Sequence, residues 1–215
     1  MKRMVLIKIC GITNVDDALA AVEAGADALG FNFYPKSPRY IAPGEARRII
    51  EQLPQEVLCA GVFVNEDADS LQRIVHEAGL GAAQLHGDES PEFCRDLRGV
   101  MRIKALRVGE DFLAEEVTRF GTEAILLDAF TKDAFGGTGR TFDWEVARRA
   151  RELVPKLFLA GGLTTENVSE AVRAVRPFAV DVCGGVETAP GRKSQRLVKN
   201  FIEAARIGAK IWDKT

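Results

Sequence analysis

The sequence predicts an α/β protein folded as one (β/α)8 barrel, the TIM-barrel architecture, over residues 1–215. Three observations support this prediction. Apolar runs of strand length occur eight times, amphipathic segments of helical length lie between them, and no linker, low-complexity tract or charge block divides the chain. Strict alternation implies parallel strands with right-handed crossovers, and eight such units favour a closed barrel over an open sheet.

The predicted strands are rich in Val, Ile, Leu and Ala. They are VLIKICGI (5–12), ALGFNF (28–33), VLCAGVFV (57–64), AAQLHG (82–87), RIKALRV (102–108), AILLDAF (124–130), LFLAGGL (157–163) and AVDVCGGV (179–186). Segment 16–26 has apolar residues at spacings of three and four, which is typical of an amphipathic helix, and segments 164–175 and 193–208 are further helix candidates. Thr164 is the expected cap of the second of these helices.

The overall composition excludes several classes of protein. A formal net charge of -2 with 28% charged residues fits neither a nucleic-acid-binding protein nor an acidic disordered chain. The four cysteines lack the close spacing of a structural zinc site, and no apolar run approaches the roughly 20 residues that span a bilayer. We therefore expect a cytoplasmic protein with reduced thiols and with neither a membrane nor a nucleic-acid partner.

Polar residues interrupt the predicted strands mainly at their carboxyl ends, where this fold places its active sites. Cys10, His86, Asp128 and Asp181 each lie near such an end. Asn32 and Asn65 lie at or just past two more. Because the ends of parallel strands meet on one face of a barrel, we expect these side chains to surround a common mouth.

Alternation along each strand predicts further members of this group. An inward-facing Cys10 implies an inward-facing Lys8, and His86 implies Gln84 in the same way. The mouth would then hold a thiol, an imidazole, two carboxylates and an amine. Such groups are costly to bury unless they are paired, so their clustering indicates function.

Taken singly, several of these residues have a simpler explanation. A buried cysteine usually packs as a small hydrophobe, and we expect this of Cys59, Cys94 and Cys183. A lone core histidine is usually a hydrogen-bonded structural residue. His76, within a helical pattern, is expected at the surface. Carboxylates inside apolar strands are harder to explain by stability alone.

Glycine pairs close the last two predicted strands. They are Gly161–Gly162 and Gly184–Gly185. Glycine backbones can approach an anion closely, and the loops after strands seven and eight of this fold commonly bind phosphate. We therefore predict a phosphorylated small-molecule ligand.

Two other loops have functional character. Residues 34–41 carry Lys36, Arg39 and Tyr40 in a proline-stiffened stretch, and Arg39 can hold a carboxylate through two hydrogen bonds. Residues 131–144 form a glycine-rich loop long enough to fold over a ligand as a lid.

Seven blocks in order carry a specific family pattern. They are KICGIT, GADALGFNFYPKSPRYI, GVFVN, QLHGDE, LLDAF…GGTGRTFDW, AGGL…ENV and RPFAVDVCGGVE…PGRK, and they span about 190 residues. Together they resemble phosphoribosylanthranilate isomerase, a single-domain (β/α)8 enzyme of tryptophan biosynthesis. The resemblance implies an Amadori rearrangement of N-(5-phosphoribosyl)anthranilate to 1-(2-carboxyphenylamino)-1-deoxyribulose 5-phosphate, with no metal and no organic cofactor.

The resemblance also implies roles for individual residues. Cys10 matches the general base of the family, Asp128 its general acid, and Arg39 the anchor of the anthranilate carboxylate. His86 and Asp181 match positions near the substrate. It leaves open whether the chain is a monomer or a homodimer.

The implied chemistry suits these residues. An acid must protonate the ribose ring oxygen so that the sugar opens to a Schiff base. A base must then remove the proton from the second sugar carbon to give an enolamine, which tautomerises to the ketone. Because a nearby cation favours a thiolate, we expect Lys8 to promote ionisation of Cys10.

The sequence departs from the family after Asp181, where two small polar residues are usual and this chain has Cys183 and Gly184. A hydroxyl contact to phosphate is therefore not expected here, whereas backbone N–H donors remain. Related barrels such as indole-glycerol-phosphate synthase or a ProFAR-type isomerase are alternatives, although Cys10 argues against both. A non-catalytic phosphometabolite-binding barrel is another, against which Cys10, Asp128 and Arg39 argue.

Overall fold

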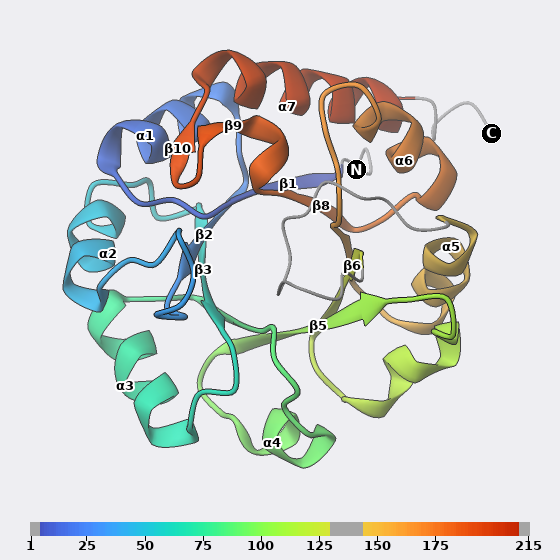
Figure 1. Ribbon diagram of the computed structural model, residues 1–215, viewed down its shortest axis with the longest axis horizontal. Coiled ribbons are helices and arrows are strands. Elements are labelled where there is room, and N and C mark those ends of the chain that lie inside the picture. The colour runs from blue at the N-terminus through green and yellow to red at the C-terminus, as the bar shows by residue number, and fades with distance from the viewer. Residues whose placement is uncertain (1–4, 130–143, 211–215) are drawn as a thin grey trace.

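Eight parallel strands close into a barrel in the computed structural model, which describes residues 5–129 and 144–210 (Figure 1). The strands are β1 (Leu6–Cys10), β2 (Ala28–Asn32), β3 (Leu58–Phe63), β4 (Ala82–Leu85), β5 (Met101–Val108), β6 (Ala124–Ala129), β7 (Leu157–Leu159) and β8 (Ala179–Val182). Each strand pairs with the next, and β8 pairs with β1. The predicted (β/α)8 barrel is thus confirmed.

Helices form a ring around the barrel (Figure 1). They are α1 (Val15–Ala24), α2 (Pro43–Ile50), α3 (Ala68–Ala78), α4 (Pro91–Asp96), α5 (Trp144–Leu153), α6 (Val168–Val175) and α7 (Gln195–Ala209). Local signals set their ends: Asn14 accepts from the backbone of Asp17 at the start of α1, and Gly25 ends that helix in the left-handed region. None of the helices within the described ranges is both long and apolar enough to span a bilayer.

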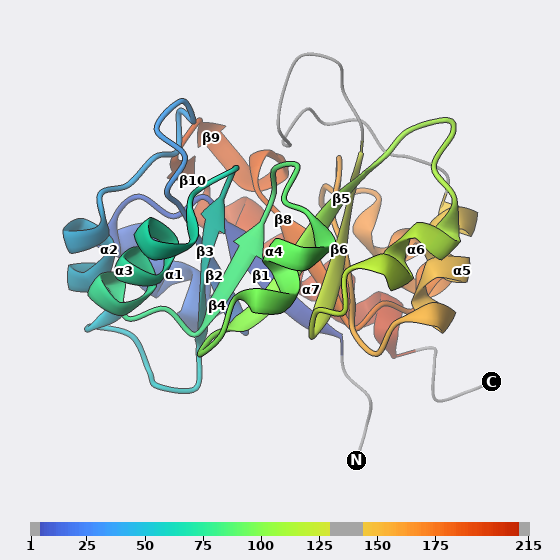
Figure 2. The same cartoon turned by 90° about the horizontal axis from the view of Figure 1, so that it is seen from below.

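The alternation of strands and helices has two irregularities. A 3₁₀ helix, η1 (Ala114–Arg119), lies between β5 and β6 where the pattern predicted an α-helix. After β8 the chain forms a short turn, η2 (Gly184–Val186), and then an unpredicted antiparallel hairpin of β9 (Glu187–Ala189) and β10 (Arg192–Lys193). Figure 2 shows this hairpin at the end of the barrel where the carboxyl ends of the strands lie.

The start of α6 differs from the prediction. The helix begins at Val168, and Asn167 rather than Thr164 is the residue at its N-cap. The Asn167 side chain accepts from the Thr164 backbone at 2.8 Å and donates to the Gly162 carbonyl at 2.9 Å. Asn167 therefore fixes the loop after β7, which the glycine pair begins.

The core has two layers. A large cluster fills the space between the strands and the surrounding helices. A smaller cluster fills the barrel interior, and many of its members are small: Ala60, Ala82, Ala105, Ala124, Ala160 and Ala179. These alanines leave room inside the barrel for longer side chains, among them the fully buried Lys8 and Lys104.

Candidate active site

A cavity of about 780 Å³ opens at the carboxyl ends of the strands, a size that suits a small-molecule ligand. All nine residues predicted for the site line it. They are Cys10, Arg39, His86, Asp128, Gly161, Gly162, Asp181, Gly184 and Gly185. The loop at 34–41 contributes further residues to the wall. The structure thus brings the predicted group together, while the role of each member stays a prediction.

Cys10 lies at the last position of β1 and faces the barrel mouth. The register of β1 and β8 pairs Lys8 with Asp181 and Ile9 with Val182, and the residues that follow these pairs are Cys10 and Cys183. A Cβ atom at Gly30, on the neighbouring strand, would lie 2.6 Å from the Cys10 sulfur. Glycine at that position therefore makes room for the thiol.

The surroundings of Cys10 favour its thiolate. A hydrogen bond from Cys183 lowers the pKa of Cys10 well below its ordinary value, and the charges of Lys8 and Lys193 act in the same direction against the effect of burial. The pKa of Cys183 is raised in turn, first by that hydrogen bond and then by burial. By contrast, burial alone raises the pKa of Cys59 to about 11.

The interpretation of Cys183 as a packing residue is therefore wrong. Its side chain lines the cavity, where its sulfur lies 3.8 Å from both the Glu187 carboxylate and the Lys193 ammonium group, and it lowers the pKa of the predicted base. Cys59 and Cys94 are buried outside the cavity lining, as expected of packing cysteines. The charge of Lys8 acts in the expected direction, since it lowers the pKa of Cys10 together with the hydrogen bond from Cys183.

Replacing Cys183 by alanine should raise the pKa of Cys10, because the thiolate loses its hydrogen-bond donor. At a pH below the new pKa the fraction of thiolate is smaller, so alkylation of Cys10 by iodoacetamide slows. The measurement is the pH dependence of that alkylation, followed at the Cys10 peptide by mass spectrometry. Cys94→Ala is the matched control, and an unchanged titration in Cys183→Ala would contradict the assignment.

Lys8 connects several of the polar groups beneath the mouth. Its ammonium group lies 3.0 Å from Asp181 and 2.9 Å from the Gln84 side-chain oxygen. Burial opposes the charge of Lys8, but Asp181 and Cys10 together outweigh this and raise its pKa. Burial also raises the pKa of Asp181 to about 7, although Lys8 acts against the shift.

His86 lies just past β4 and faces Asp128. Its Nδ1 atom is 2.8 Å from the Gln84 amide nitrogen, and its Nε2 atom is 3.2 Å from Oδ2 of Asp128. All three side chains are nearly buried. The predicted inward direction of Gln84 and Lys8 is thus confirmed, and both reach the groups at the mouth.

A buried lysine holds the loop that carries His86. The Lys104 ammonium donates to the Leu85 and Gly87 carbonyls at 3.2 and 2.8 Å and pairs with Glu89 at 2.7 Å. Glu89 in turn accepts from the backbone of Asn65 and Gly87. Asn65, expected near the mouth, does not line the cavity and instead supports this loop.

Replacing Lys104 by methionine should lower the free energy of unfolding by about 3 kcal/mol, because it leaves the Glu89 carboxylate buried without its partner. Denaturant titration measures this loss. Lys199→Met, which removes an exposed lysine from α7, is the control and should change stability by less than about 0.5 kcal/mol. Equal effects of the two substitutions would contradict a structural role for the buried pair.

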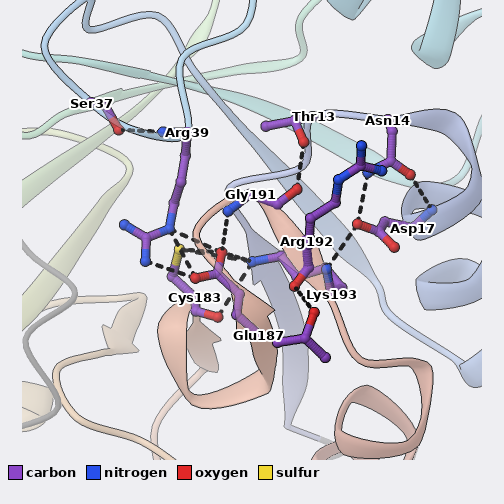
Figure 3. A network of polar contacts seen from close by, with 11 residues as sticks. Thr13, Asn14, Asp17, Ser37, Arg39, Cys183, Glu187, Gly191, Arg192 and Lys193 are labelled. Carbon is purple, nitrogen blue, oxygen red and sulfur yellow. Dashed lines mark hydrogen bonds and ion pairs between the residues drawn. The ribbon is translucent and has the colours of Figure 1, made fainter.

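Arg39 is held by a polar network at the β9–β10 hairpin (Figure 3). Its Nε and Nη2 atoms donate to Glu187 at 2.9 and 2.7 Å, and Lys193 donates to the same carboxylate at 2.8 Å. The Glu187 and Lys193 side chains are 5% and 1% exposed. The pair therefore orients Arg39, whose Nη1 atom takes no part in these bonds.

The hairpin itself is tied to the loop after β1 and to the first turn of α1 (Figure 3). Thr13 donates to the Gly191 carbonyl at 2.6 Å, and Asp17 accepts from the Lys193 backbone at 2.8 Å. Sequence reasoning did not identify Glu187 or Lys193 as parts of the site. Both lie in the last of the seven family blocks, but only the hairpin shows that they meet Arg39.

The predicted phosphate-binding glycines also serve close packing. Gly161 and Gly162 have φ angles of +82° and +65°, which favour glycine. A Cβ atom at Gly161 would collide with the Ala129 backbone, and one at Gly185 with the Leu163 carbonyl. Packing explains part of their presence, so phosphate binding stays a prediction. The predicted lid at 131–144 lies outside the described residues, except for Trp144 at the start of α5.

Comparison with known proteins indicates the same family as the seven sequence blocks. The family model for N-(5'-phosphoribosyl)anthranilate isomerase matches residues 7–204. A protein of that name from Trichlorobacter lovleyi is 49% identical over 203 residues, 94% of this chain and 98% of the relative.

Solved structures give the same result. The phosphoribosylanthranilate isomerase of Thermotoga maritima superposes with a TM-score of 0.89 at 47% identity, covering 94% of this chain and 98% of that one. Another, solved in complex with reduced 1-(o-carboxyphenylamino)-1-deoxyribulose 5-phosphate, has a TM-score of 0.85 at 45% identity, with the same coverage. The chain therefore belongs to the N-(5'-phosphoribosyl)anthranilate isomerase family.

Proposed function

We propose that this chain performs its family's isomerisation, a step of tryptophan biosynthesis, with Cys10 as the general base and Asp128 as the general acid. The observation that carries this assignment is the shared cavity, in which a thiol with a strongly lowered pKa and a carboxyl group beside an imidazole both line the wall. One base and one acid are what the reaction requires.

The reaction begins with two proton transfers. Asp128 donates a proton to the ribose ring oxygen, and the ring opens to a Schiff base between the first sugar carbon and the anthranilate nitrogen. The Cys10 thiolate then removes the proton from the second sugar carbon, which gives an enolamine. Tautomerisation of the enolamine gives 1-(2-carboxyphenylamino)-1-deoxyribulose 5-phosphate. Loss of the proton gained by Cys10 and reprotonation of Asp128 restore both groups, and no co-reactant is consumed because the substrate and the product are isomers.

The remaining residues hold the two ends of the substrate in this proposal. Arg39, oriented by Glu187, binds the anthranilate carboxylate through its remaining donors. Backbone N–H groups at Gly161, Gly162, Gly184 and Gly185 bind the phosphate. A relative was solved in complex with reduced 1-(o-carboxyphenylamino)-1-deoxyribulose 5-phosphate, a ligand that carries both a carboxylate and a phosphate, which supports this proposal. His86 and Asp181 lie between the two ends.

The direct test follows the loss of N-(5-phosphoribosyl)anthranilate fluorescence after the protein is added. We expect turnover that scales with protein concentration and needs no added metal or cofactor. The absence of turnover by the folded protein would overturn the proposed function. Inorganic phosphate at increasing concentration should compete with the substrate, and a lack of competition would contradict the phosphate site.

We also propose a cytoplasmic location and a monomeric or homodimeric state. The four cysteines are free, which suits a reducing compartment. One solved structure similar to this chain shows monomers that were generated from the dimeric phosphoribosylanthranilate isomerase of Thermotoga maritima. Light scattering on the purified chain distinguishes the two states.

A further inference from the structure

The hydrogen-bond partners of Gln84 fix the orientation of its side-chain amide. A lysine ammonium has only donors, so the Gln84 atom 2.9 Å from Lys8 must be the amide oxygen. The other end of the amide is then its nitrogen, which lies 2.8 Å from Nδ1 of His86 and can only donate to it. Nδ1 of His86 must therefore present a lone pair.

This assignment decides the tautomer of His86. A neutral imidazole carries one proton, and with Nδ1 as an acceptor the proton lies on Nε2. Nε2 is 3.2 Å from Oδ2 of Asp128, not aligned as a hydrogen bond, and has no other partner among the described residues. Such bonds often align only when substrate binds.

The two oxygens of Asp128 are consequently unequal. Oδ2 faces the N–H group of His86, so a proton on that oxygen would oppose the imidazole proton. Oδ1 lies on the side of Gly161, where even a Cβ atom would come within 3.0 Å. Because Gly161 has no side chain, no Cβ atom crowds Oδ1 from that direction, and Oδ1 has no hydrogen-bond partner among the described residues. This is the oxygen that can carry a proton toward a ligand.

We propose that Gln84 is a positioning residue that holds His86 in the Nε2–H tautomer, so that His86 directs the acidic proton of Asp128 to Oδ1 and stabilises the carboxylate left after the proton is donated. This inference rests on the proposed role of Asp128. Lys8 fixes Gln84, Gln84 fixes His86, and His86 acts on Asp128. None of the first three groups needs to touch the substrate for this effect.

The test replaces Gln84 by glutamate. The carboxylate can keep Lys8 as a partner, but it accepts from His86 instead of donating, so the imidazole proton should move to Nδ1. Nitrogen-15 NMR of the labelled protein reads the tautomer directly. The chain has only two histidines, so His76→Gln assigns the signals, and the exposed His76 serves as an internal control.

In the wild type we expect the Nε2–H form, and in Gln84→Glu the Nδ1–H form. We expect kcat to fall about 10- to 100-fold in Gln84→Glu, because the Asp128 carboxylate loses a hydrogen bond, with little change in KM. Gln84→Met, which has no polar group, should give a mixture of tautomers and an intermediate kcat. Gln72→Glu, an exposed change of the same kind on α3, should alter neither.

Three results would overturn the inference: an Nδ1–H imidazole in the wild type, an unchanged tautomer in Gln84→Glu, or a changed tautomer with an unchanged kcat. A wild type without isomerase turnover would instead overturn the proposed function and the catalytic half of the inference. The NMR measurement would still decide whether Gln84 sets the tautomer.

Discussion

Replacing Cys10 by alanine is expected to lower kcat about a thousandfold, because the proton on the second sugar carbon loses its base. In free-energy terms this is about 4 kcal/mol of transition-state stabilisation. The thiol is poised for this role by the hydrogen bond from Cys183 and the nearby ammonium of Lys8, which lower its pKa. Steady-state assays by substrate fluorescence measure the loss.

The control for this variant is Cys59→Ala. Cys59 is also buried on a barrel strand, but it does not line the cavity, and burial raises its pKa to about 11. We expect it to change kcat less than about threefold, since it touches neither substrate nor base. A Cys10→Ala protein that is folded and keeps more than about a tenth of the wild-type kcat would refute the assignment of the base.

Asp128→Asn should also lower kcat by about a thousandfold, because the amide cannot deliver a proton to the ring oxygen. The substitution keeps the shape of the side chain and its place beside His86, so the fold and the substrate affinity should change little. The measurement is the separate determination of kcat and KM, with far-ultraviolet circular dichroism to confirm folding.

Asp181→Asn provides the decisive comparison. Asp181 lines the same cavity, and its pKa of about 7 would suit a general acid. Its ion pair with the buried Lys8, however, gives it a structural task that Asp128 lacks. We expect Asp181→Asn to lower kcat less than Asp128→Asn does. The reverse order would transfer the acid role to Asp181.

Much of the site could be predicted because strand parity and strand ends are local properties of the sequence. Lys8 and Cys10 two residues apart, like Gln84 and His86, had to share the inner face of their strands. Parallel pairing then placed their ends on one rim, whichever strands were neighbours. The position of the mouth followed from these two rules.

The contacts between distant segments could not be predicted in this way. Cys183 resembled a packing residue because its meeting with Cys10 depends on the exact register of β1 and β8. Glu187 meets Arg39 only through a hairpin that no apolar alternation signals. The α-helix expected after β5 proved to be 3₁₀, because short helices depend on packing more than on periodicity.

The position of Lys8 has a consequence for how the site responds to change. The Lys8 ammonium group contacts Asp181 and Gln84 and lies near Cys10. The predicted base, Cys10, and the Gln84–His86 pair beside the predicted acid therefore depend on the same positive charge. A substitution that weakens one of these contacts also changes the interactions of Lys8 with the other groups. The groups at the mouth therefore form one thermodynamically coupled unit, and the free-energy effects of paired substitutions within it are not additive.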